Sequence, residues 1–145
     1  MRRTALACVL SVAGTLLVAC GGGGGGSAGS GGGGGGGGGA VSFSTQVQPL
    51  FTNYCILCHA PGGSASFLHL TAGSSYAQLV GVASTLTAGG GARVQPSDST
   101  SSVLWKRVSG VGLDVTESVM PPGFIMPSAE LALIQAWIDA GAPNN

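Results

Sequence analysis

The feature that most restricts the fold of this chain is a glycine run, "GGGGGGSAGSGGGGGGGGG", at residues 21–39. Glycine has no side chain to bury, so no hydrophobic contact offsets the entropy that is lost when such a segment is ordered. Together with Cys20 and Ala40, the run predicts a flexible tether over residues 20–40, with a random-coil end-to-end distance of about 25 Å. It separates a short N-terminal segment from one small domain over residues 41–145.

The N-terminal segment has the organisation of an export signal. Arg2 and Arg3 give it a positive start, and no charged residue follows up to position 19. This uncharged stretch is too short to span a bilayer and fits the apolar part of a secretory signal. It ends in "LLVAC", which resembles the lipobox of bacterial lipoproteins. The resemblance implies a signal peptide over residues 1–19 and lipidation of Cys20; an ordinary signal peptide and an uncleaved anchor helix are the alternatives.

Charge and cysteine content exclude several classes of protein. Removal of the signal leaves three basic side chains against five acidic ones, a net charge of −2. A domain without a basic face is not expected to bind nucleic acid. Of the four cysteines in the chain, Cys8 lies in the signal and Cys20 at the lipidation position. The domain keeps Cys55 and Cys58, which are too few for a disulfide framework.

The stretch "NYCILCHAPGG" at residues 53–63 concentrates the reactive side chains of the domain, Cys55, Cys58 and His59. A disulfide would close a very small loop and leave His59 without a role. A thioredoxin-like redox pair requires a βαβ unit, and no such unit is recognisable. A structural zinc site requires four ligands, and His69 offers only a third. The spacing Cys-x-x-Cys-His is that of covalent haem attachment, which uses all three residues.

The chemistry of that attachment follows from the spacing. On a helix, Cys55 and Cys58 share a face. Each thiol can then add to one of the two haem vinyl groups and form a thioether. His59 follows directly and can turn its imidazole under the iron. The sequence therefore predicts haem c, held by Cys55 and Cys58, with His59 as the proximal iron ligand.

The remaining pattern predicts an all-α domain of about four short helices with long loops. No alternating strand pattern is recognisable, and long loops in a small domain are typical of segments that wrap something. On the third helix Val103, Leu104, Arg107 and Val108 share a side, and Arg107 lies near the C-terminal end, where cations are favoured. The expected helices cover residues 44–58 (capped by Ser44 or Thr45), 74–81 and 128–141 (capped by Ser128), and a further helix follows a Ser or Asp cap between Ser97 and Ser102.

Residues 43–145 resemble the small mono-haem cytochrome c domains of bacterial lipoproteins and exported multidomain proteins. The resemblance rests on "STQVQPLFTNYCILCHAPGG", "LTAGSSYAQLVG", "RVQPSDSTSSVLWKRVSG", "MPP" and "LALIQAWIDAGAPNN". It implies a mono-haem cytochrome c fold, in which the first and last helices cross and pack. The apolar residues that would meet are Val47, Phe51, Tyr54, Leu131, Ile134, Trp137 and Ile138.

The same resemblance implies the second iron ligand. In the family, the ligand is the methionine of a Met-Pro pair that precedes a Pro/Gly loop and the final helix. Met120 fits that position, Met126 is the alternative, and His69 is a more distant candidate. Methionine also commonly fills cores. Arg93 is a candidate partner for a haem propionate, because a guanidinium matches a carboxylate; a solvated surface arginine is the alternative.

These features together predict an electron-transfer protein rather than an enzyme. We expect a membrane-tethered one-electron carrier with covalent haem c and His/Met-ligated iron. It is expected to be lipid-anchored, to face the periplasm or the cell exterior, and to meet redox protein partners in transient contacts. The alternative is a haem-based catalytic or sensory domain whose sixth coordination site is open.

Overall fold

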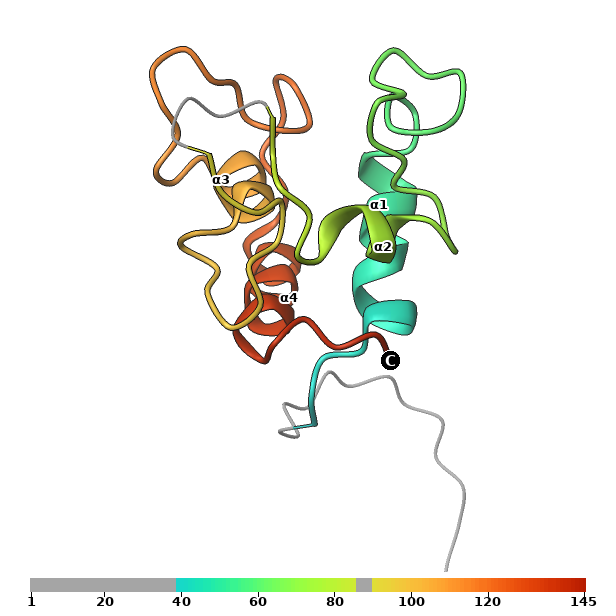
Figure 1. Ribbon diagram of the computed structural model, residues 1–145, viewed down its shortest axis with the longest axis vertical. Coiled ribbons are helices and arrows are strands. Elements are labelled where there is room, and N and C mark those ends of the chain that lie inside the picture. Colours follow the sequence, from blue (N-terminus) through green and yellow to red (C-terminus); the bar gives the residue numbers. More distant parts are fainter. Residues whose placement is uncertain (1–38, 86–89) are drawn as a thin grey trace, which may run out of the picture. The chain divides into compact units, whose positions relative to one another are not determined.

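The computed structural model describes residues 39–85 and 90–145. The predicted signal peptide, Cys20 and nearly all of the tether lie outside the described residues. The elements are a π-helical turn, η1 (Phe43–Val47), and four α-helices, α1 (Gln48–Tyr54), α2 (Ser75–Leu79), α3 (Val103–Ser109) and α4 (Ser128–Asp139) (Figure 1). The described part of the chain contains isolated bridges but no strand, which confirms the all-α class. No helix among these residues is long and apolar enough to cross a membrane.

The first helical segment begins slightly earlier and ends earlier than the sequence predicts. The hydroxyl of Ser42, rather than that of Ser44 or Thr45, caps it by accepting a hydrogen bond from the backbone N–H of Thr45 at 3.4 Å. α1 ends at Tyr54, so the predicted continuation to Cys58 is wrong. The two cysteines therefore lie in the turn that follows the helix, and not on a helical face.

Shared hydrogen bonding explains this early end. The N–H groups of both Cys55 and Ile56 donate to the carbonyl of Phe51, at 2.9 and 3.2 Å. The N–H groups of Cys58 and His59 then both donate to the carbonyl of Cys55, at 3.1 and 2.9 Å. These paired bonds replace the regular helical series and close a single tight turn that contains the cluster.

The other helices lie close to their predicted positions. α2 follows Ser74, and α3 follows Ser102. α4 begins at Ser128, which was expected to cap it; the capping position is Pro127. Gly141 has φ +97°, a conformation that glycine adopts without the steric cost of a side chain, and the helix ends just before it as predicted.

Aromatic side chains of η1 and α4 form the centre of the core. Phe43 and Trp137 are 5% and 0% exposed, and their ring centroids lie 5.1 Å apart. Trp137 donates its indole N–H to the carbonyl of Pro143 at 2.9 Å, so its polar group is satisfied. The N–H of Ser44 donates to the carbonyl of Asn145 at 2.8 Å. The beginning and the end of the domain are thus held together.

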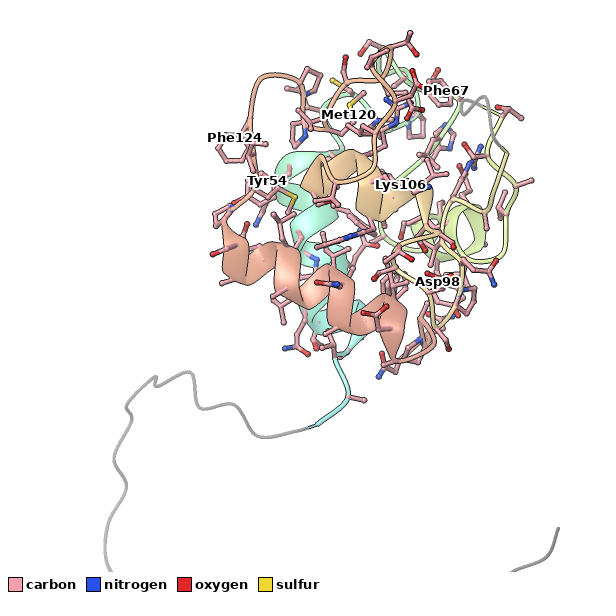
Figure 2. The ribbon with its side chains drawn as sticks, turned by 90° about the vertical axis from the view of Figure 1, so that its left-hand side faces the viewer. Tyr54, Phe67, Asp98, Lys106, Met120 and Phe124 are labelled. Carbon is pink, nitrogen blue, oxygen red and sulfur yellow. The ribbon has the colours of Figure 1, made fainter. Side chains whose placement is uncertain are left out.

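The apolar residues expected to join the first and last helices share one buried cluster. The contact between the two segments is made mainly by η1, the turn that precedes α1. Tyr54 lies at the edge of the cluster and stacks on Phe124, with ring centroids 5.7 Å apart (Figure 2). The buried members from these segments are Phe43, Val47, Leu50, Phe51, Ile134, Trp137 and Ile138.

A buried polar network joins α1 to α2 and to the loop between them. Gln48 donates its side-chain N–H to the carbonyl of Leu70 at 3.0 Å and accepts a hydrogen bond from the hydroxyl of Ser75. Gln48 and Ser75 are both buried. Buried polar groups are costly unless they are paired, so this network fixes how the loop lies on α1.

We predict that Gln48→Leu lowers the free energy of unfolding by about 1–3 kcal/mol, because it leaves the Ser75 hydroxyl and the Leu70 carbonyl buried without this partner. Urea unfolding measures the change. Gln135→Leu, at a half-buried position of α4, is the matched control. Equal losses in the two variants would contradict a stabilising role of the network.

The loop before α3 is organised by Asp98. Its carboxylate accepts hydrogen bonds from the hydroxyl and the backbone N–H of Ser101, at 2.6 and 2.9 Å, and from the hydroxyl of Thr100 at 2.8 Å. These bonds favour the charged form, chiefly those from Ser101, and lower the pKa of Asp98 from 3.8 to about 2. A carboxyl group whose pKa is lower in the folded than in the unfolded state stabilises the fold at every pH at which it is ionised.

We therefore predict that Asp98→Asn destabilises the protein at neutral pH but not in strong acid. The contribution of Asp98 is complete above the unfolded pKa of 3.8 and is lost as the pH falls through the folded pKa of about 2. Melting temperatures of the two proteins, measured from pH 7 down to pH 2, should converge. A difference that stays constant over this range would refute the assignment.

Candidate functional site

The loop after α1 folds back onto the cysteine–histidine cluster. The carbonyl of Cys58 accepts a hydrogen bond from the N–H of Ala65 at 3.0 Å, and the carbonyl of His59 accepts one from the N–H of Leu70 at 2.8 Å. Leu70 is in turn held by Gln48 of α1. The backbone of His59 is therefore fixed both to the preceding turn and, through Leu70, to the helix.

Gly63 allows this loop to close. Its N–H donates to the carbonyl of Ala60 at 2.9 Å. A Cβ atom at position 63 would overlap the carbonyl oxygen of Cys58 and would lie 2.8 Å from its carbonyl carbon. A residue with a side chain would have to push the Cys58 backbone away, so the close approach requires glycine here.

Cys55 and Cys58 are free thiols, and both are half-buried. Burial, with a smaller contribution from Cys58, raises the pKa of the Cys55 thiol to about 11. Reactive cysteines of redox enzymes have lowered pKa values, because the thiolate is the attacking species. The surroundings of Cys55 therefore do not favour a thioredoxin-like role.

The imidazole of His59 is held against an aromatic ring but lacks a polar partner. It meets the ring of Phe67 edge to face, with centroids 6.0 Å apart and an interplanar angle of 84°. Its Nδ1 atom is buried and makes no hydrogen bond within the described residues. A buried nitrogen without a partner costs about 1–3 kcal/mol, which a group bound beside it could offset.

No three His, Cys, Asp or Glu side chains of residues 39–85 and 90–145 lie close enough together to hold a metal ion by themselves. His69 in particular does not line the cavity that contains His59. Its backbone N–H donates to the side-chain oxygen of Gln78 at 2.7 Å, and its side chain is half-buried. His69 is therefore not placed to act as a third zinc ligand beside Cys55 and Cys58.

An apolar cavity lies between the loop after α1, α2 and α3. The centre of a water-sized sphere can move through about 210 Å³ of it, and all of its empty space, open solvent at the mouth included, is about 920 Å³. Cys55 and His59 line it together with Met120. Figure 2 shows Met120 and Phe67, another lining residue, at the same end of the domain. Its aliphatic walls are formed by Leu68, Leu70, Leu79, Val103, Leu104 and Val108.

The two candidate methionines lie in different surroundings. Met120 is half-buried and lines the cavity that also contains His59. Met126 is 2% exposed and belongs to the hydrophobic core. Of the two methionines, Met120 is therefore the one that shares a cavity with His59, although 60 intervening residues separate the two in sequence.

Two arginines border the same cavity. Arg93 lines it and donates a guanidinium N–H to the carbonyl of Gln78 at 2.8 Å, so this side chain is partly fixed rather than freely solvated. Arg107 of α3 also lines the cavity. The helical spacing places Arg107 on the same side of α3 as Val103 and Val108, which also line the cavity. That shared side is the sequence signal for a site role of Arg107, which its position near the helix C-terminus alone does not indicate.

No protein-family model, curated protein or solved structure matches this chain. The side chains that surround the cavity are therefore the basis for a functional proposal. They comprise one thiol, one imidazole, one thioether and two guanidinium groups around an aliphatic wall. The second thiol, that of Cys58, lies one turn from the first.

We predict that Gly63→Ala lowers the free energy of unfolding by about 1–3 kcal/mol, because the added methyl group must displace the Cys58 backbone. Urea unfolding measures the loss. Ser64→Ala, at the exposed neighbouring position, is the control and should change stability by less than about 0.5 kcal/mol. A Gly63→Ala protein as stable as the control would show that the loop relaxes at no cost.

Proposed function

We propose that residues 41–145 form a mono-haem cytochrome c domain that carries single electrons. The observation that supports this most directly is the convergence of Cys55, His59 and Met120 on one apolar cavity. These side chains come from segments that are remote in sequence, and each matches one role in covalent, six-coordinate haem binding. The early end of α1 does not disturb the match, because Cys55 and Cys58 remain within one hydrogen-bonded turn.

The residues present fit a haem group in three respects. The aliphatic wall suits a flat hydrophobic macrocycle. His59 lines the cavity, and its buried Nδ1 atom makes no hydrogen bond within the described residues, so no protein group competes at that atom. The free thiol of Cys55 lines the same cavity, and thioether formation requires a reduced cysteine.

Each residue then has a defined task. Cys55 and Cys58 would hold the group covalently, and His59 and Met120 would serve as the two iron ligands. When bound, haem c supplies an iron that alternates between the ferrous and ferric states. Arg93, at the border of the cavity, can pair with a propionate. The aliphatic wall excludes water, and methionine as the second axial ligand raises the reduction potential.

The N-terminal segment gives this carrier its location. We propose that the signal over residues 1–19 exports the chain and that Cys20 bears the lipid. The glycine tether over residues 20–40 then lets the domain move between a redox donor and an acceptor near the membrane. Its contacts with these proteins are small and transient, as in other electron-transfer complexes.

The first test is whether haem is covalently attached. We expect the protein, exported from a host that matures c-type cytochromes, to be coloured and to keep its pigment in acid–acetone. Its pyridine haemochrome spectrum should be that of two thioethers, and Cys55→Ala should shift it to that of one. A colourless wild-type protein, or a pigment extracted intact by the solvent, would refute the proposal.

The second test separates the two methionines. We predict that Met120→Ala loses the red absorption band of a thioether bound to ferric iron, has a lower reduction potential, and binds carbon monoxide when reduced. Met126→Ala should keep the band but lose about 2–5 kcal/mol of stability, because it opens a hole in the core. A wild-type protein that itself binds carbon monoxide readily would favour the catalytic or sensory alternative.

A further inference from the structure

The segment that carries Met120 has no helix or strand of its own, and one residue of α3 ties it down. Arg107 donates from Nη1 to the carbonyl of Ser118 at 3.0 Å and from Nη2 to Oε1 of Glu117 at 2.8 Å. The carbonyl of Arg107 accepts a hydrogen bond from the N–H of Met120 at 2.7 Å. Three bonds thus join Arg107 to the four residues that end at Met120.

Glu117 is itself fixed within the loop. Its second carboxylate oxygen accepts a hydrogen bond from the N–H of Asp114 at 3.2 Å, and its own N–H donates to the carbonyl of Asp114 at 2.9 Å. The side chains of Arg107 and Glu117 are only 18% and 12% exposed. An ion pair with so little access to water is weakly screened, and loss of one partner leaves a charge without compensation.

We call the pair Arg107 and Glu117 the clamp. Its arginine is carried by α3, which is packed into the core. Leu104 and Val108, on either side of Arg107 in sequence, belong to the hydrophobic core. The planar guanidinium presents its N–H groups in a fixed fork, so it can hold a carbonyl and a carboxylate at the same time. A lysine at the same place would keep the charge but would lose the fork.

We propose that Arg107 and Glu117 are positioning residues that keep Met120 in the cavity and thereby keep the sixth coordination position closed. This inference rests on the proposed haem function. When the clamp is weakened, the segment around Met120 opens more often. The apparent affinity of the iron for an external ligand then rises in proportion to the open fraction.

The charge of Arg107 could also act on the iron directly, since the residue lines the cavity. Two variants separate charge from position. Arg107→Lys keeps the charge and removes the fork. Lys106→Gln removes a positive charge from the neighbouring position of α3, which does not line the cavity. A positional role predicts a strong effect of the first variant and a weak effect of the second.

The experiment uses the ferric protein with haem attached and measures the red thioether–iron band and the binding of azide. We expect Arg107→Lys and Glu117→Ala to weaken the band and to bind azide about tenfold more tightly than the wild type. Lys106→Gln should match the wild type. Asp98→Asn, destabilised in the loop that precedes α3, should also match it, which separates loss of the clamp from a general loss of stability.

The outcomes distinguish the inference from the function on which it rests. Attached haem, with an unchanged band and azide affinity in both clamp variants, would overturn the inference and leave the proposed function intact. Equal changes in Lys106→Gln or Asp98→Asn would overturn it too, because charge or global stability would then be the cause. A wild-type protein without covalent haem would overturn the proposed function, and the inference with it.

Discussion

The apolar contact between η1 and α4 is the interaction on which the rest of this domain depends. Phe43 and Val47 pack on Trp137 and its neighbours, and they bring the two ends of the domain together. This contact fixes the direction in which α1 runs, and therefore the point from which the loop with Cys55 and His59 departs. Helices as short as these are not stable alone in water, so their stability comes from this packing.

Polar contacts fix the loops that surround the cavity. Much of the chain around the cavity is loop, and ordering a loop costs conformational entropy that buried apolar surface must offset. The Gln48 network holds the loop after α1, and Arg107 holds the loop before α4. Figure 1 shows these two loops, in green and in orange, at the same end of the domain. Each is thus anchored to a different helix while facing a common cavity.

This arrangement gives the iron ligands of the proposed haem centre unequal support. His59 is fixed through backbone hydrogen bonds to the turn after α1 and to Leu70. Met120 is fixed by one backbone bond and, beyond that, through the side chains of Arg107 and Glu117. The methionine side is therefore the one that single side-chain changes can loosen. In a haem protein, a loosened methionine would leave the iron open to an external ligand. The support of Met120 would therefore decide between an electron carrier and a ligand-binding domain.

The sequence alone was sufficient for the helix positions to within a few residues, the apolar faces that meet in the core, and the grouping of Cys55, Cys58 and His59. These depend on composition or on spacings of three and four residues, which are local properties of the chain. Tertiary structure decided that α1 stops at Tyr54, that Met120 rather than Met126 shares the cavity with His59, and that Arg107 holds the Met120 segment. Both methionines precede proline, and the resemblance favours Met120; the folded domain separates them by placing Met120 in the cavity and Met126 in the core. Such differences depend on contacts between residues remote in sequence, which local spacing does not encode.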